Sequence, residues 1–155
     1  MRAALNSSRA FGYSRWSFAG SISQRAAISR IPAGTYTFVD EMDDDGNPQA
    51  GTQGRGPGGG GPRLKVKVTV GEGEMAVDWD GCSAAVARPL NAVRAITESA
   101  TWYVVRCVTG AAGEGRLVNS GSFAPVRVVV PRGSFLDAEP PHAVAGGNVE
   151  TSQRI

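Results

Sequence analysis

Residues 89–108 limit the fold more than any other part of the chain, because they contain no glycine in a protein of 155 residues that has 21. Their apolar side chains recur every three or four residues, which is the spacing of one helix face. The stretch therefore predicts one long helix, and Asn91 is placed to cap its N-terminus. The apolar positions on the predicted face are Val93, Ile96, Ala100, Tyr103, Val104 and Cys107.

Four short segments rich in β-branched residues predict strands at residues 35–39, 64–70, 75–79 and 126–130. In the second segment, leucine and valine alternate with lysine and threonine, so one face should be buried while the other meets water. The turn GEGE between the second and third segments predicts a hairpin. The fold class we expect is α+β, with antiparallel β hairpins packed on one long helix in an incomplete domain.

The sequence divides into a basic N-terminal segment, residues 1–31, and a second part, residues 32–155. The first segment has five arginines and no acidic residue, a composition typical of an organellar transit peptide. The alternative is the cut end of a helix, because Ile22, Ala26 and Ile28 lie near one face and Pro32 would stop the helix. Both interpretations stay open from the sequence.

The glycine-rich segment at residues 50–62, AGTQGRGPGGGGP, has nothing to bury and predicts a flexible insertion in the second part of the chain. A phosphate-binding loop is followed directly by a helix, whereas this segment is followed by the strand predicted at residues 64–70. We therefore do not expect the segment to bind a nucleotide.

The composition excludes several classes of partner. A net charge of +2 does not provide a chain-wide surface for nucleic acid, and no stretch of about 18 apolar residues is present to span a membrane. Cys82 and Cys107 lack the spacing of a zinc site and are expected to be buried, reduced thiols. His142 is solitary and is expected to have a surface or loop-packing role and not a catalytic one. We predict no metal site.

Two acidic clusters are candidate sites of chemistry. Residues 43–45 lack the spaced ligands and the closing glutamate of a calcium loop, and are expected to form a solvated turn. Asp78 and Asp80 flank Trp79 at a strand end, where alternation places both carboxylates on one face and paired carboxylates could act as acid and base. No partner base is identifiable, so the catalytic residues stay unknown.

The order of the segments resembles a known family. The blocks YTFVDEMDDDG, LKVKVTV, VDWDGCS, LNAVRAITESATWYVVRC, NSGSFAPVRVVVPRGSFLD and AVAGGNVETSQRI resemble consecutive blocks of hydantoinase B proteins and of the C-terminal part of 5-oxoprolinases. The resemblance covers residues 32–155 apart from the glycine-rich insertion, and its most specific part is GGNVETSQR. It identifies the chain as an internal fragment of this family.

The resemblance implies part of an ATP-dependent hydrolase that opens cyclic amides, such as 5-oxoproline in glutathione metabolism or hydantoins. It places ATP with magnesium on a hydantoinase A-like subunit or domain, so this segment should bind no cofactor itself. It also implies a cytoplasmic enzyme that is oligomeric when complete, with no nucleic-acid or membrane partner. The basic N-terminus leaves organellar targeting as the alternative location.

The chain also departs from the family pattern. Family members carry a longer N-terminal portion with a histidine- and aspartate-containing motif that can hold a metal, and this chain lacks that motif. Family members also continue beyond TSQRI, so we expect the chain to be inactive alone and its exposed apolar faces to cause poor solubility or oligomerisation. The alternative to a catalytic contribution is a non-catalytic remnant or assembly module of the family. A gene-model artefact or a degenerate paralogue would also explain these departures from the family pattern.

The candidate substrate-binding residues lie in the last block. The glycine pair would let a ligand approach the backbone, and Thr151 is placed to cap a new helix whose N-terminus would favour a developing anion. Amide, carboxylate, hydroxyl and guanidinium groups surround the pair. The alternative is that Thr151 or Ser152 only caps the helix while the other residues pack. The candidates are Asn148, Glu150, Thr151, Ser152 and Arg154.

Overall fold

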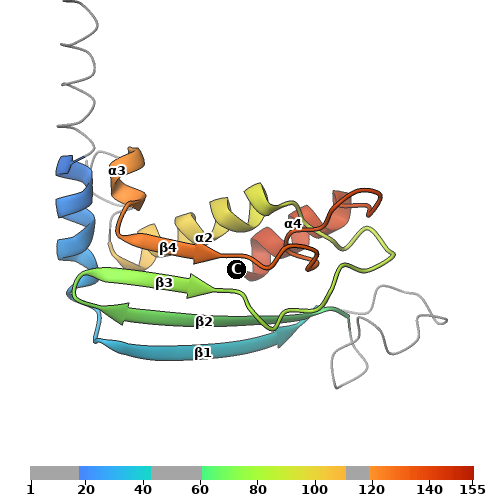
Figure 1. Ribbon diagram of the computed structural model, residues 1–155, viewed down its shortest axis with the longest axis horizontal. Helices are drawn as coiled ribbons and strands as arrows, with labels where there is room; N and C mark the ends of the chain where they lie inside the picture. The colour runs from blue at the N-terminus through green and yellow to red at the C-terminus, as the bar shows by residue number, and fades with distance from the viewer. Residues whose placement is uncertain (1–17, 43–60, 111–118) are drawn as a thin grey trace, which may run out of the picture.

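The computed structural model describes residues 18–42, 61–110 and 119–155, which form one four-stranded sheet with helices (Figure 1). The strands lie in the order β1-β2-β3-β4. Their bounds are β1 Gly34–Glu41, β2 Arg63–Gly71, β3 Glu74–Asp78 and β4 Val126–Val129. The labelled helices are α2 Arg94–Val108, α3 Ser120–Phe123 and α4 Ala145–Arg154. The mixed α+β class predicted from the sequence is confirmed.

The predicted hairpin between the second and third strands is present, but the sheet is not wholly antiparallel. β2 pairs antiparallel with both β1 and β3, and Glu72 and Gly73 form the tight β2–β3 turn with positive φ angles of 50° and 76°. β4 pairs parallel with β3, with Met75 opposite Val126. This arrangement follows from α2, which carries the chain back across the sheet between the two parallel strands.

α2 occupies the predicted stretch, but it begins later and buries a different face. Its N-cap is Val93, whereas Asn91, the predicted cap, lies before the helix and is fully buried. The buried residues of α2 are Thr97, Thr101 and Val105. Tyr103 and Cys107, predicted to face the core, are exposed. The threonines can be buried because each hydroxyl has a hydrogen-bond partner, as described below.

The prediction of a single long helix is not confirmed, because other helical segments accompany α2. Residues 18–28 are helical and the helix ends ahead of Pro32, in agreement with the helix interpretation of that stretch. Its transit-peptide alternative concerns processing and stays a prediction. The short helix α3 packs on α2 through Phe123 and Trp102, whose ring centroids are 4.4 Å apart.

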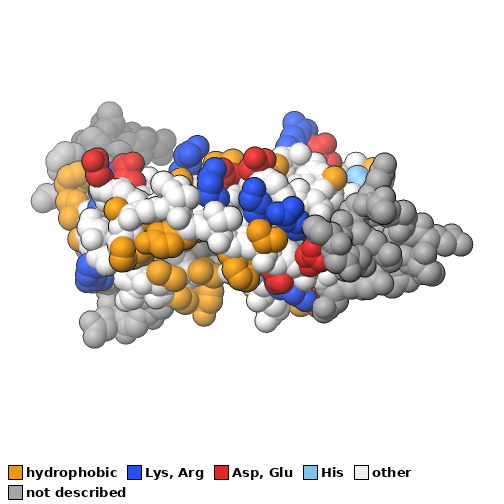
Figure 2. Space-filling view, turned by 90° about the horizontal axis from the view of Figure 1, so that it is seen from below, with side chains coloured by type: hydrophobic (Ala, Val, Ile, Leu, Met, Phe, Trp, Pro, Cys, Tyr) orange, Lys and Arg blue, Asp and Glu red, His pale blue; other side chains and the backbone are white. Residues whose placement is uncertain are grey.

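The core lies between α2 and one face of the sheet, and it continues into the loops that follow β3 and β4. Phe135 and Leu136 come from the second of these loops and are fully buried. The opposite face of the sheet carries charged side chains such as Lys67. Viewed from the β1 side, most charged side chains lie along one half of the surface and hydrophobic ones gather in the other (Figure 2). Other members of the core cluster are Ile28, Met42, Leu64, Val70, Met75, Val77, Trp79, Val105, Val126 and Val130.

Candidate functional site

The motif GGNVETSQR forms helix α4, which begins at Ala145 and not at Thr151 as predicted. Gly146 and Gly147 therefore lie in the first helical turn. A side chain at Gly147 would overlap the backbone carbonyl group of Leu90, and the Gly147 amide donates a 2.6 Å hydrogen bond to the Pro89 carbonyl. The glycine pair serves close packing of two backbone segments within the protein.

Asn148 and Thr151 face the interior of the molecule. The Asn148 Oδ1 accepts a 3.1 Å hydrogen bond from the amide of Val93, the N-cap residue of α2. Thr151 is fully buried in the middle of α4, so it does not cap the helix. Its Oγ1 has no hydrogen-bond partner among the described residues.

The other three candidate residues lie in separate surroundings. Arg154 Nη1 donates to Asp40 Oδ2 and to the Glu41 carbonyl, both at 3.2 Å, and so connects α4 with β1. Glu150 and Ser152 are exposed, and the Ser152 hydroxyl donates to the Val149 carbonyl at 2.8 Å. The five predicted residues thus share one helix but do not converge on one point within the described structure.

Asn91 joins three segments through its side-chain amide. Its Oδ1 accepts from the Val86 amide at 2.7 Å. Its Nδ2 lies 2.8 Å from the Val86 carbonyl and 3.0 Å from the carbonyls of Arg88 and Ala143. We call the contact of α4 with residues 86–93 the α4 junction. The sequence signal for this role is a polar residue in a largely apolar stretch, directly before a helix.

A row of hydroxyl groups joins α2 to the sheet and to the loop after β4. The Thr97 hydroxyl donates to the Leu136 carbonyl at 2.7 Å, and the Thr101 hydroxyl donates to the Thr97 carbonyl at 2.7 Å. The Trp79 Nε1 donates to Thr101 Oγ1 at 3.3 Å. At the end of α2, Thr109 accepts from Gln24 Nε2 at 3.3 Å, which links the helix of residues 18–28. These bonds fix α2 over the sheet.

An apolar recess of about 330 Å³ opens between α2 and the sheet. The Thr101 hydroxyl already accepts the bond from Trp79. None of the lining residues carries a charged side chain, so the recess suits an apolar surface better than a cyclic amide or a phosphate. Its lining consists of Ile31, Tyr36, Val66, Val68, Val70, Met75, Val77, Trp79, Thr101, Val104, Val105, Val108 and Ile155.

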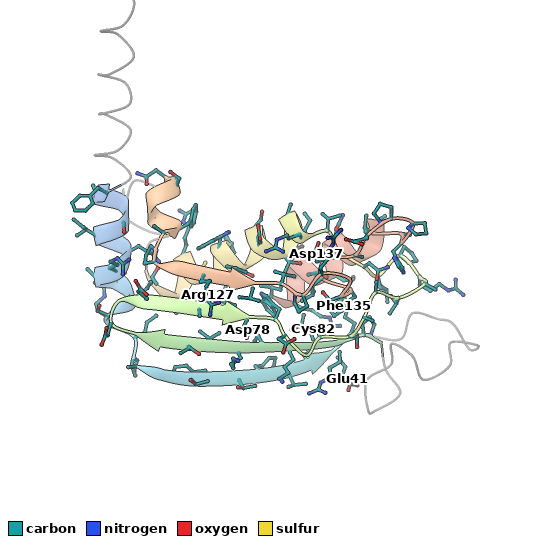
Figure 3. All side chains as sticks on the ribbon, viewed as in Figure 1. Glu41, Asp78, Cys82, Arg127, Phe135 and Asp137 are labelled. Atoms are coloured by element: carbon teal, nitrogen blue, oxygen red, sulfur yellow. The ribbon has the colours of Figure 1, made fainter. Side chains whose placement is uncertain are left out.

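The polar face of the sheet carries an ion pair rather than paired carboxylates. Lys67 Nζ lies 3.1 Å from Asp78 Oδ2, and Asp78 Oδ1 accepts from the Asp80 amide at 3.1 Å. Burial acts to raise the pKa of Asp78, but these two hydrogen bonds and the charges of Lys67 and Arg127 outweigh it and hold the pKa below 3.8. Figure 3 shows Asp78 and Arg127 on neighbouring strands. Asp78 is thus held as a carboxylate, which does not favour a proton-donating role.

The two thiols differ from each other and from the prediction that both are buried. Cys107 is exposed, whereas Cys82 is partly buried and exchanges hydrogen bonds with the backbone of Lys65, at 3.3 Å from its amide and 3.2 Å to its carbonyl. Burial raises the pKa of the Cys82 thiol, which disfavours a nucleophilic thiolate. Cys82 therefore continues the pairing of β2 beyond the end of β3.

His142 and the acidic residues do not form a metal site in the described parts of the chain. His142 is exposed as predicted, and its Nδ1 lies 2.8 Å from the Glu139 carbonyl. The acidic turn at residues 43–45 and most of the glycine-rich insertion lie outside the described residues. Within the described parts of the chain, no three His, Cys, Asp or Glu side chains gather in a way that could hold a metal ion. No helix in those parts is long and apolar enough to cross a membrane.

Comparison with known proteins decides the family. The model of the hydantoinase B/oxoprolinase family matches residues 15–155. This protein belongs to the hydantoinase B/oxoprolinase family. It is similar to 5-oxoprolinase of Saccharomyces cerevisiae, with 43% identity over 82 residues, and to 5-oxoprolinase 1 of Arabidopsis thaliana, with 40% identity over 84 residues. These matches cover 53% and 54% of this chain but only 6% of each relative.

Solved structures of two larger proteins contain the same fold. The ATP-dependent caprolactamase from Pseudomonas jessenii matches with a TM-score of 0.67 at 16% identity, over 88% of this chain and 21% of that one. A nucleotide-free acetone carboxylase matches with a TM-score of 0.65 at 18% identity, over 84% of this chain and 17% of that one. At these identities the similarity shows a shared fold.

Proposed function

We propose that this chain forms part of the non-nucleotide half of an ATP-dependent hydrolase that opens cyclic amides such as 5-oxoproline or hydantoins. The supporting observation is the family match over residues 15–155, together with 40–43% identity to two 5-oxoprolinases. An amide carbonyl is a poor electrophile, and phosphorylation of its oxygen would prepare it for attack by water. In this proposal a hydantoinase A-like partner binds ATP with magnesium. The apolar recess of this chain has no charged lining, which supports placing the phosphates elsewhere.

Within this proposal, the residues of α4 divide into two groups. Asn148 and Arg154 hold the helix against α2 and β1 through the hydrogen bonds described above. Glu150 and Ser152 are exposed on the same helix and would face a cyclic amide or its phosphorylated form. The carboxylate can accept from the ring amide, and the hydroxyl oxygen, whose proton goes to the Val149 carbonyl, can accept as well. The rest of the binding site would come from parts of the complete enzyme that this chain does not contain.

The direct test mixes the full chain with a hydantoinase A-like partner and measures ATP consumption with and without 5-oxoproline or a hydantoin. A full-length homologue, assayed in parallel, is the control. ATP use that depends on the cyclic amide and on this chain is the expected result. A silent mixture beside an active homologue would contradict the proposal.

The role of α4 is tested in the full-length homologue at the positions that match Glu150, Ser152 and Thr151. Replacing Glu150 with glutamine should lower kcat/KM by about tenfold or more, the loss typical of a removed charged hydrogen-bond partner. Thr151→Val is the matched control on the same helix, because the Thr151 hydroxyl is buried without a partner among the described residues. Full turnover after replacing both Glu150 and Ser152 would remove α4 from the site.

The second candidate function is a non-catalytic assembly module of the same family. The apolar recess favours it, because an open surface with this lining suits a protein contact. In this case the chain would bind the hydantoinase A-like partner without supporting ATP use. Co-sedimentation of the two proteins in the silent mixture would select this function over the first.

A further inference from the structure

β1 is an outer strand of the described sheet. No described element pairs with it beyond β2 (Figure 1). The strand has eight residues without lysine or proline, and its large side chains are exposed: Tyr36 by 47%, Phe38 by 63% and Val39 by 43%. Soluble proteins usually protect such an edge with charge, proline or a covering segment. This edge therefore has the properties of a pairing surface.

The hydrogen-bond pattern shows which backbone groups are available. Just beyond β1, the Met42 amide donates to the Pro62 carbonyl, so the even-numbered residues of β1 direct their backbone groups toward β2. Lys65 confirms the alternation, because its amide and carbonyl bond to Cys82 instead of to Val39 opposite it. The odd-numbered residues Thr35, Thr37 and Val39 thus direct their amides and carbonyls to the open side.

The open side ends at Glu41. The Glu41 amide would be the next group in the row, but it donates to Asp40 Oδ1 at 2.9 Å. The available groups are therefore those of Thr35, Thr37 and Val39, which we call the β1 edge. This set is symmetric about Thr37.

We propose that the β1 edge pairs with the β1 edge of a second copy of this chain, antiparallel and with Thr37 opposite Thr37. In this register, Thr35 of each copy exchanges hydrogen bonds with Val39 of the other, so every available group is used. Centring the pair on Phe38 would instead require the Glu41 amide, which Asp40 already occupies. The backbone thus favours the register centred on Thr37 over the one centred on Phe38.

The side chains fit the same register. Tyr36 of one copy lies opposite Phe38 of the other, and cross-strand aromatic pairs stabilise antiparallel sheets. Both residues are on the sheet face of the apolar recess, because they lie opposite Val68 and Val66 of β2. Pairing therefore extends each recess across the symmetry axis. Asp40 lies opposite Gly34, so no like charges face each other, and one strand supplies both halves of the contact.

Sedimentation equilibrium on the full chain tests this proposal, with two variants at Thr37. Thr37→Pro removes an amide that points away from β2, so it should abolish the dimer without removing a bond inside the sheet. Thr37→Glu places two carboxylates opposite each other across the axis and should weaken association by about tenfold or more. Thr69→Glu is the matched control, because Thr69 is also exposed and lies on the same face, one strand further in.

A concentration-dependent dimer that Thr37→Glu weakens and Thr69→Glu leaves intact is the expected result. Circular dichroism checks that each variant folds, and Thr37→Glu alone decides the outcome should Thr37→Pro unfold. A monomeric wild-type chain would overturn the proposal. A dimer unaffected by Thr37→Glu would overturn it as well, because another surface would then hold the copies together.

A cross-linking experiment tests the register. With Cys107 replaced by serine, Thr37→Cys should give a dimer with a short thiol-reactive cross-linker, because position 37 meets its own copy. Thr35→Cys is the matched variant and should cross-link poorly, because position 35 meets Val39. Cross-linking at position 35 but not at position 37 would contradict the register. This outcome is independent of ATP hydrolysis, so the failure of either proposal is recognisable separately.

Discussion

The α4 junction and the β1 edge lie in one small protein, and they differ in how completely they satisfy their backbone groups. At the junction, Asn91 and Gly147 are buried and every contact is made within the described chain. At the edge, Thr35, Thr37 and Val39 direct backbone groups away from β2, to a side where no described element pairs, beside exposed aromatic rings. The hydrogen bonds of the junction are therefore satisfied within the protein, whereas the backbone groups of the edge are available to pair with a second chain.

This difference changes the meaning of the family motif. The glycines and Asn148 of GGNVETSQR serve the junction, so their chemistry is used to hold α4 against residues 86–93. In the proposed function, the outer residues of α4 are the ones that would meet a ligand. A motif that identifies a family can thus include architectural residues, and its exposed residues are where function should be sought.

The largest effect is expected from Asn91→Ala, which would leave the backbone groups of Val86, Arg88 and Ala143 without their side-chain partner. The two Val86 groups are buried and the other two are partly buried, and each unsatisfied buried polar group costs about 1–3 kcal/mol, so the free energy of unfolding should fall by about 3 kcal/mol. Urea denaturation monitored by circular dichroism measures the loss. Thr35→Ala at the β1 edge is the matched control and should change little. Equal stabilities of the two variants would remove the contrast between the regions.

A smaller loss is expected from Gly147→Ala. The added methyl group would overlap the Leu90 carbonyl group, so α4 must move away from residues 86–93. Overpacking of this kind costs about 1–3 kcal/mol. Gly71→Ala is the control, because a side chain there meets no atom within 4 Å. A Gly147→Ala variant as stable as Gly71→Ala would show that the junction is loosely packed.

The sequence predicted the strands better than the helices, and the reason is physical. Alternation between Leu64 and Val70 reports burial directly, since one strand face meets the core and the other meets water. The helix α2 instead buries Thr97 and Thr101, whose hydroxyls are satisfied by the Leu136 carbonyl and the Trp79 indole. A count of apolar positions cannot detect such partners, so it placed the most buried face one residue away, on the half-buried Ile96, Ala100 and Val104.

The start of α4 and the pairing of β4 were missed for a related reason. Two adjacent glycines ordinarily argue against a helix, and only the nearby Pro89–Leu90 backbone explains them. The pattern of β4 likewise does not indicate a parallel partner, because an apolar segment such as VRVVV can pair with a neighbouring strand that runs in either direction. The family resemblance was recognisable from local blocks, but the dispersal of the five candidate residues depends on contacts distant in sequence.

The smallest effect is expected on the polar face of the sheet, where Asp78 pairs with Lys67 between the junction and the edge. The pKa of Asp78 is lower in the folded protein than its ordinary value of 3.8. Its contribution to stability is therefore present above that value and is lost as the pH falls through the folded-state pKa.

Asp78→Asn should flatten the dependence of the unfolding free energy on pH below about 4, measured by urea denaturation. Lys67→Met should flatten it in part, because it removes the ion-pair partner while the Asp80 amide and Arg127 remain. Lys65→Met removes a lysine from the same strand without breaking that pair and should keep the wild-type slope. Equal slopes for Lys67→Met and Lys65→Met would show that general charge, and not this pair, sets the acid stability of the sheet.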